Sequence, residues 1–175
     1  MASILMVAGE GLPFIKTGGL ADVIGSLPKA LTERGHEVKV VMPLYKKISD
    51  KYYNELHFDC EYSVSINYHE VPVRVFSKVV DNVCFFFIQH QGYFERDSLY
   101  GYQDDGERFG YFQKAVIEML NQLNYWPNII HCHDWHTGMI PCMVKETHDA
   151  DPRYRAIRFV YTIHNMAYQG NFGPE

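Results

Sequence analysis

Apolar and polar positions fall into blocks that predict strands followed by helices. Residues 3–8 form an uninterrupted apolar run, which is typical of a strand buried on both faces of a parallel sheet. After a glycine-containing loop, apolar residues recur at the spacing of one helix face, at Leu20, Val23, Ile24, Leu27 and Leu31. We expect Pro28 to kink this helix or to remove one of its backbone bonds, and Gly35 to end it. A second strand at residues 36–45 completes a strand–helix–strand unit.

The middle of the chain departs from this order. Residues 71–80 and 82–90 look like two strands that meet near Asp81 and Asn82. We expect them to form an antiparallel hairpin, or an excursion that leads back to a strand of the sheet. Glycines, acidic residues and aromatic residues make residues 92–112 rich in loops.

Strands and helices alternate again towards the end of the chain. A helical stripe covers residues 107–123, and a short strand follows at 128–134. A helix is then expected at 136–148 and a further strand at 158–165. We therefore predict an α/β fold, with a Rossmann-like, doubly wound, mainly parallel sheet and a β-hairpin excursion in its middle.

Composition and charge narrow the class of protein. The net charge of −5 argues against a general nucleic-acid binder, although it leaves room for a local cationic pocket. The four cysteines form no C-x-x-C pair, so we expect reduced thiols in a cytoplasmic protein. The apolar run at the start is too short for a signal peptide or a membrane span, and we expect no membrane association.

Three segments should meet beyond the carboxyl ends of the strands, where ligands bind in open α/β sheets. The first of these, residues 9–19, contains Lys16 directly before Thr17 and the glycine pair Gly18 and Gly19. Glycines allow a ligand to approach the backbone N–H groups, and the helix that follows offers the positive end of its dipole. These features indicate a phosphate-binding lip, and an ordinary strand-to-helix turn with a solvated lysine is the alternative.

The second and third segments, "HCHDWHTG" and "YTIHNMAYQG", carry histidines and polar side chains. In an extended strand His131 and His133 point to the same face, so the first of the two segments could hold a metal or simply bury histidines in the core. Alternatively, Asp134 and His136 line a cleft and bind sugar hydroxyls. His164 lies at the carboxyl end of its strand together with Asn165, where a ligand group or a turn cap is expected.

Four segments in this order, "KTGGLADVIGSLP", "LYGYQDDGERFGYF", "HCHDWHTG" and "YTIHNMAYQG", closely resemble the bacterial glycogen synthase and plant starch synthase family. The resemblance covers essentially the whole chain. It implies a retaining α-1,4-glucosyltransferase of the GT-B fold that acts in glycogen biosynthesis. Residues 1–175 then correspond to the N-terminal catalytic domain, and the partner across the cleft is a C-terminal nucleotide-binding domain of the same protein, without which we expect no activity.

The resemblance also implies substrates and roles for particular residues. The donor is ADP-glucose or UDP-glucose, with ADP-glucose preferred, and the acceptor is an α-1,4-glucan; no metal and no cofactor is required. The implied catalytic residues are His164, Asp134 and Lys16, and the implied substrate-binding residues are Lys16, Gly18, Gly19, Asn165, His136 and Glu10. Lys16 and the glycines would lie beside the donor diphosphate, and His164 near the transferred glucose. Asp134 and Asn165 would contact sugar hydroxyls or shape the acceptor side, and Glu10 would contact the acceptor or support the loop. Gly9 departs from the small hydroxylated residue that is often found at its position in the family.

Two other classes of function remain open on the sequence. One is a non-catalytic module that binds glucan or nucleotide. The other is a metal-dependent hydrolase that uses the cluster from His131 to His136.

Overall fold

Seven strands form one mixed sheet in residues 1–171, the part of the chain that the computed structural model describes. The strands are β1 (Ser3–Val7), β2 (Glu37–Pro43), β3 (His57–Ile66), β4 (His69–Val80), β5 (Val83–Gln89), β6 (Ile129–His133) and β7 (Arg158–Thr162). Their order across the sheet is β3-β4-β5-β2-β1-β6-β7. The strands from β5 to β7 in this order run parallel to one another, whereas β3 pairs antiparallel with β4 and β4 antiparallel with β5. The predicted α/β fold with a mainly parallel sheet and a hairpin excursion is thus confirmed.

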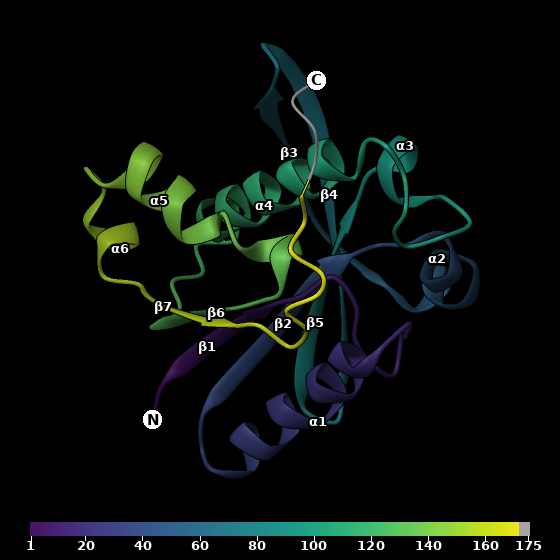
Figure 1. Ribbon diagram of the computed structural model, residues 1–175. Helices are drawn as coiled ribbons and strands as arrows, with labels where there is room; N and C mark the ends of the chain where they lie inside the picture. The colour runs from purple at the N-terminus through teal and green to yellow at the C-terminus, as the bar shows by residue number, and fades with distance from the viewer. Residues whose placement is uncertain (172–175) are drawn as a thin grey trace.

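Helices cover both faces of the parallel part of the sheet. They are α1 (Gly19–Glu33), α2 (Lys46–Tyr52), α3 (Gln91–Phe94), α4 (Asp105–Gln122), α5 (Ile140–His148) and α6 (Pro152–Arg155), with 3-10 turns η1 (Tyr53–Glu55) and η2 (Trp135–Thr137). In Figure 1, α1 lies on one side of the sheet, and α4 and α5 lie on the other. β1 is therefore enclosed, and its residues from Leu5 onward are fully buried, as a continuous apolar run predicts.

Helix α1 shows how local sequence sets an element. It runs through Pro28 without a break, because proline lacks only the one N–H that would have bonded to the preceding turn. It ends as predicted at Gly35, whose φ of +85° suits a residue without a Cβ. The N–H of His36 bonds to the carbonyl of Leu31 at 3.1 Å, and that of Gly35 to Thr32 at 2.9 Å. This pair of bonds is the Schellman arrangement, which satisfies the last carbonyls of the helix.

The hairpin of β4 and β5 is confirmed, but the structure adds a strand that the sequence analysis missed. Strand β3 occupies residues 57–66 and pairs along its length with β4. Asn67 and Tyr68, between the two strands, both have positive φ, as do Asp81 and Asn82 between β4 and β5. Positive φ at both central residues is the geometry of tight hairpin turns that match strand twist. The excursion therefore has three strands, and β5 returns it to the parallel sheet beside β2.

Smaller differences concern where helices begin. Helix α4 begins at Asp105 rather than at residue 107, and α3 lies within the segment predicted to be loop. Helix α2 was also not predicted. The single helix expected at 136–148 is divided into the 3-10 turn η2 and helix α5, with Pro141 in the first turn of α5.

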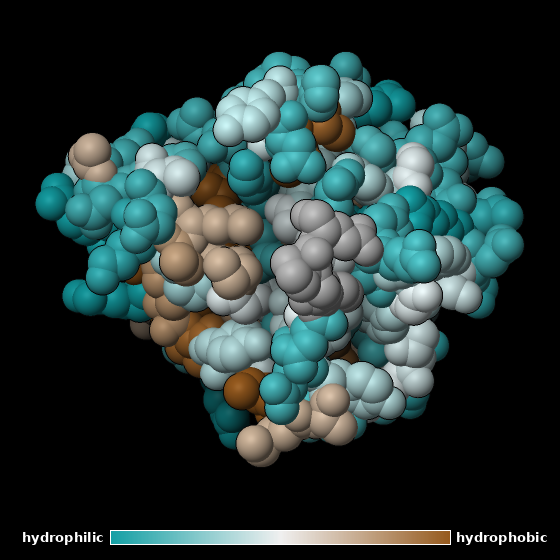
Figure 2. Space-filling model, turned by 45° about the horizontal axis from the view of Figure 1, so that its top comes forward, coloured by the Kyte–Doolittle hydropathy of each residue, from teal (hydrophilic) through white to brown (hydrophobic). Residues whose placement is uncertain are grey.

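The outer edge of the sheet at β7 exposes apolar side chains. They are Val160, Tyr161, Ile163, Met166 and Tyr168, on β7 and the segment that follows it, together with Met139 before α5. Figure 2 shows hydrophobic side chains gathered on one side of a surface that is otherwise mostly hydrophilic. None of the helices in the described residues combines the length and the apolar character that a membrane span needs.

Candidate functional site

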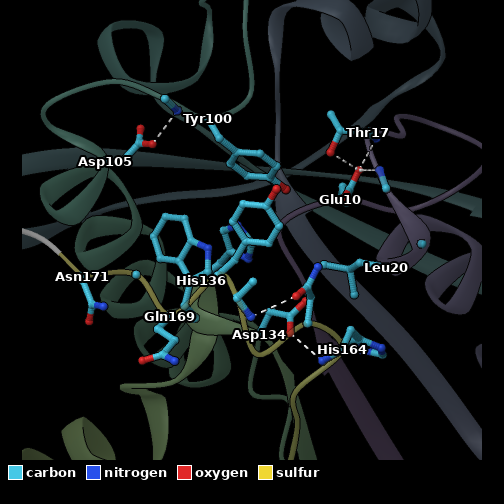
Figure 3. Close-up of a pocket in the computed structure, with 18 residues that line it drawn as sticks. Glu10, Thr17, Leu20, Tyr100, Asp105, Asp134, His136, His164, Gln169 and Asn171 are labelled. Carbon is cyan, nitrogen blue, oxygen red and sulfur yellow. Dashed lines mark hydrogen bonds between the residues drawn. The ribbon is translucent and has the colours of Figure 1, made fainter.

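The three segments predicted to converge do line one pocket, of about 1120 Å³ (Figure 3). The order of the strands explains this position. In the sheet, β1 lies between β2 on one side and β6, followed by β7, on the other. The loops after β1 and β6 therefore lead in opposite directions and leave a crevice between them. The segment after β7 and the loop before α4 close the sides of the crevice.

Glu10 ties the loop after β1 to the start of α1. Its carboxylate is buried, with 4% of the residue exposed, and accepts hydrogen bonds from the Thr17 N–H, from the Thr17 hydroxyl at 2.9 Å and from the Gly18 N–H at 3.4 Å. Glu10 thus supports the loop, one of the two roles that the resemblance implied. It also takes up the N–H of Gly18, one of the groups that the sequence analysis assigned to a ligand.

The first turn of α1 keeps N–H groups available for a ligand. Gly18 precedes the helix in an extended conformation, and among residues 1–171 no side chain caps the helix at this end. The backbone N–H groups of a first turn have no partner within the helix, and the helix dipole adds partial positive charge there. Gly18, Gly19 and Leu20 line the pocket. This end of α1 can therefore accept an anionic group.

Lys16 lies outside the set of residues that line the pocket. Its ammonium group binds both carboxylate oxygens of Asp22 at 2.7 Å, and about half of each side chain is exposed. Lys16 was predicted to face a phosphate, but in this structure its ammonium group pairs with Asp22 in the first turn of α1.

Asp134 joins the ends of β6 and β7. Its carboxylate accepts a hydrogen bond from the backbone N–H of His164 at 2.7 Å, and its own N–H donates to the carbonyl of Thr162 at 3.0 Å. The backbone of Asp134 has φ 58° and ψ −178°, a region that residues other than glycine rarely occupy and that costs roughly 1–3 kcal/mol. The chain therefore holds Asp134 in a strained conformation at the point where it orients His164.

The histidines divide into two groups. His131, His133 and His164 lie together: the first two rings are 4.0 Å apart, and Nδ1 of His133 lies 2.9 Å from Nε2 of His164. His131 and His133 thus share one face, as an extended strand predicts. His136 instead packs against the rings of Tyr100 and Phe109, at 4.6 and 4.8 Å.

Burial keeps the central histidines neutral. Burial, together with the nearby His131 and His164, lowers the pKa of His133 to about 3, and burial alone lowers that of His136 to about 3. His136 packs against Tyr100 and Phe109, whereas His131 and His133 contact each other. The three histidines that are close in the sequence therefore do not form one cluster in the structure. Within residues 1–171 no group of three His, Cys, Asp or Glu side chains is arranged to hold a metal ion.

The loop before α4 and the first residue of that helix contribute residues that sequence reasoning did not assign. Tyr100, Gly101 and Asp105 line the pocket, and the carboxylate of Asp105 accepts the N–H of Gly101 at 2.7 Å. A Cβ on Gly9 would lie 2.9 Å from the Tyr100 hydroxyl and 2.9 Å from the ring of His136. The departure at Gly9 therefore has a steric reason, because this arrangement leaves no room for a larger residue.

The segment after β7 forms the remaining wall. Asn165 lines the pocket, and its side chain also caps a turn by accepting the N–H of Ala167 at 2.9 Å. Gly170 has φ +64° and lies against Trp135, where a Cβ would lie 2.8 Å from the nearest ring atom. Of the predicted site residues, Glu10, Gly18, Gly19, Asp134, His136, His164 and Asn165 thus line the pocket, and Lys16 does not.

Comparisons with known proteins bear on the family and the fold of the chain. The family model of the starch synthase catalytic domain matches residues 3–175. A glycogen synthase of Streptococcus agalactiae is 46% identical over 172 residues, and one of Clostridium kluyveri is 46% identical over 169 residues. The chain is matched over 98% and 97% of its length and spans 36% of each relative. The catalytic domain of starch synthase IV from Arabidopsis thaliana, bound to ADP and acarbose, matches 97% of the chain with a TM-score of 0.85 and 33% identity, and 35% of that structure is covered.

Proposed function

Because the chain belongs to the starch synthase catalytic domain family, we propose that it forms the N-terminal half of the active site of a glycogen synthase. The enzyme would transfer glucose from a nucleotide sugar to the non-reducing end of an α-1,4-glucan, with retention of configuration. One observation carries the proposal: a single pocket joins an uncapped helix N-terminus to His164 and Asp134, so a diphosphate and a sugar can bind side by side.

The start of α1 is proposed as the diphosphate side of the site. Its first-turn N–H groups and the dipole of the helix favour an anion. Glu10 already occupies the N–H groups of Thr17 and Gly18, so the diphosphate would lie closer to Gly19 and Leu20. A bound diphosphate would also compete with Asp22 for Lys16, since the pair is exposed and thus weak.

ADP-glucose is the proposed donor. Starch synthase IV, at 33% identity over nearly the whole chain, was solved with ADP and acarbose. ADP is what ADP-glucose leaves behind after glucosyl transfer, and the acceptor is proposed to be an α-1,4-glucan. The base of the nucleotide would be bound mainly by a C-terminal domain, which we propose lies in the additional length of the relatives.

The proposed chemistry follows from charge. Negative charge grows on the leaving diphosphate in the transition state, and helix N–H groups with Lys16 would stabilise it. His164 would lie beside the glucosyl group, with its peptide oriented by Asp134. The acceptor hydroxyl would attack from the same face and pass its proton to the leaving phosphate, which explains retention without a metal or a cofactor.

The first test is incorporation of labelled glucose from ADP-glucose into glycogen by the full-length protein, with the 175-residue chain assayed alongside. Incorporation by the full-length protein and none by the chain alone would support an active site shared with a second domain. Absence of incorporation from both ADP-glucose and UDP-glucose would contradict the proposal and favour the binding module.

Replacement of Lys16 by alanine tests the diphosphate side. We expect kcat to fall by about 10²-fold or more, as when one charge-stabilising donor is lost. The free energy of unfolding should change by less than about 1 kcal/mol, because the ion pair with Asp22 is exposed. Lys29→Ala is the matched control, since Lys29 also lies on α1 in an exposed ion pair, with Asp81 at 3.4 Å. Equal turnover of the two variants would refute the role of Lys16.

A further inference from the structure

His133 lies between two other histidines at the carboxyl end of β6. The planes of the His133 and His164 rings differ by 14°, and the two rings meet edge to edge at the short contact between His133 Nδ1 and His164 Nε2, at 2.9 Å. On its other side it packs against His131, whose Nε2 lies 2.7 Å from the hydroxyl of Thr162. His133 is fully buried, and its second ring nitrogen, Nε2, has no hydrogen-bond partner within residues 1–171.

These contacts determine where the protons lie. Burial lowers the pKa of His133 to about 3, so near neutral pH its ring carries one N–H. If that proton were on Nε2, a buried donor would have no acceptor, which is rare in proteins and more costly than an unused lone pair. The proton therefore belongs on Nδ1, where it is donated to Nε2 of His164. A neutral His164 that accepts on Nε2 must carry its own proton on Nδ1.

We propose that His133 is a positioning residue that fixes the His164 ring in its Nδ1–H tautomer, so that His164 offers the ligand a hydrogen-bond donor. The preferred tautomer of free histidine in water has its proton on Nε2, so the contact reverses the intrinsic preference. Asp134, the next residue in the chain, holds the backbone N–H of His164. Two consecutive residues thus fix His164: His133 contacts its ring, and Asp134 binds its backbone.

The partner of this donor would be an oxygen atom of the substrate, either a sugar hydroxyl or a phosphate oxygen. This step rests on the proposed function, because His164 is placed beside the transferred glucose only in that scheme. The tautomer itself does not depend on it. The two therefore need separate measurements.

Nitrogen NMR of the histidine side chains tests the tautomer in the 175-residue chain without any substrate. At about pH 8, above the usual histidine pKa, we expect His164 to show a protonated Nδ1 and a bare Nε2. A protonated Nε2 on His164 in the unmodified chain would overturn the proposal. If the tautomer is found but the full-length protein transfers no glucose, the proposed function fails and the assignment stands.

Two substitutions test the positioning role in the full-length protein. His133→Phe keeps a ring of similar size but removes the donor, so His164 should return to the Nε2–H tautomer and kcat should fall about tenfold or more, with KM for the donor within about twofold. His133→Asn places an amide N–H near the position of Nδ1, so it should retain the tautomer and recover most of kcat. Equal losses of kcat in both variants would mean that His133 only fills space.

A control variant separates these effects from general disturbance. His69→Phe changes an exposed histidine at the start of β4, in the three-stranded excursion. It should alter neither the His164 spectrum nor kcat. If His133→Phe behaves like this control in both measurements, the proposal is wrong.

Discussion

Asp134 combines a strained backbone with a hydrogen bond that orients the site. Three substitutions separate the two contributions at this residue. Asn keeps a side-chain acceptor and the strain, Gly relieves the strain without an acceptor, and Ala keeps the strain and loses the acceptor. We expect the free energy of unfolding, measured by urea denaturation, to be highest for the Asn variant, lower for the Gly variant and lowest for the Ala variant. Ala should lie roughly 1–3 kcal/mol below Asn.

The order of these variants carries the test, rather than any single value. Glycine also makes the unfolded chain more flexible. At ordinary positions a Gly variant is therefore less stable than the matching Ala variant. A Gly variant more stable than the Ala variant would therefore be direct evidence of strain at Asp134. Equal stability of the Asn and Ala variants would contradict the contribution of the bond to His164.

Residues at the ends of strands could be predicted from the sequence, but their partners could not. Asp134 and His164 follow apolar strands, so their position at the pocket follows from the strand assignments alone. The contact between His133 and His164 depends on how the chain turns at Asp134, where strand alternation stops. Lys16 was expected at the pocket, yet nothing in the spacing of charges shows that Asp22, six residues further along the chain, binds it instead.

At the scale of elements, a buried ion pair holds the loop that brings Tyr100 to the pocket. Arg108 is fully buried and binds the carboxylate of Asp105, the carbonyl of Tyr93 at 2.7 Å and that of Leu99 at 3.2 Å. Because these acceptors come from both ends of the loop, the guanidinium group links the loop to α4. The five donors of arginine suit this role better than the single ammonium group of lysine.

Asp105→Ala should therefore lower the free energy of unfolding by about 3–5 kcal/mol, since it leaves the Arg108 charge buried without a counterion. The neighbouring residue provides a matched control. Asp104 also pairs with an arginine, Arg96 at 2.6 Å, but the two side chains are 38% and 25% exposed. Asp104→Ala should cost about 1 kcal/mol or less. Similar losses in the two variants, measured by urea denaturation, would show that burial does not govern these pairs.

Most elements, but not all, could be predicted from hydrophobic patterning. The parallel strands and α1 were found because continuous apolar runs and helical stripes are strong signals. Strand β3 carries alternating apolar residues from Phe58 to Ile66, which is the period of a half-buried strand. It was missed because its turn at Asn67–Tyr68 lacks the glycine that usually marks a hairpin. Its alternation becomes meaningful only once one face packs against α4, as when the Tyr62 hydroxyl donates to the carbonyl of Ala115.

At the scale of the whole molecule, histidines with lowered pKa gather at the carboxyl end of the sheet, where the pocket lies. His90 directly follows β5, His131 and His133 belong to β6, and His136 follows β6. Burial is the leading cause of the lowered pKa in each case. The end of the sheet that forms the site is thus also the part that resists protonation.

This distribution predicts that the protein loses stability in mild acid. A histidine with a pKa of about 3 when folded and 6.5 when unfolded binds its proton only in the unfolded state between these values. The free energy of unfolding should therefore be constant above about pH 6.5 and fall below it, by about 1.4 kcal/mol per pH unit for each such group. Between pH 6.5 and pH 5, His133 and His136 should each contribute a loss of about 2 kcal/mol, and His90 and His131 act in the same direction.

Urea denaturation at several pH values between about 7.5 and 5 measures this loss without interference from most carboxylates, which titrate at lower pH. His136→Phe removes one of the two deeply buried imidazoles. Below pH 6.5 it should therefore reduce the slope of the free energy of unfolding against pH by about 1.4 kcal/mol per pH unit, whatever its effect on stability at pH 7.5. A free energy of unfolding that stays level down to pH 5 would mean that these histidines are protonated in the folded protein.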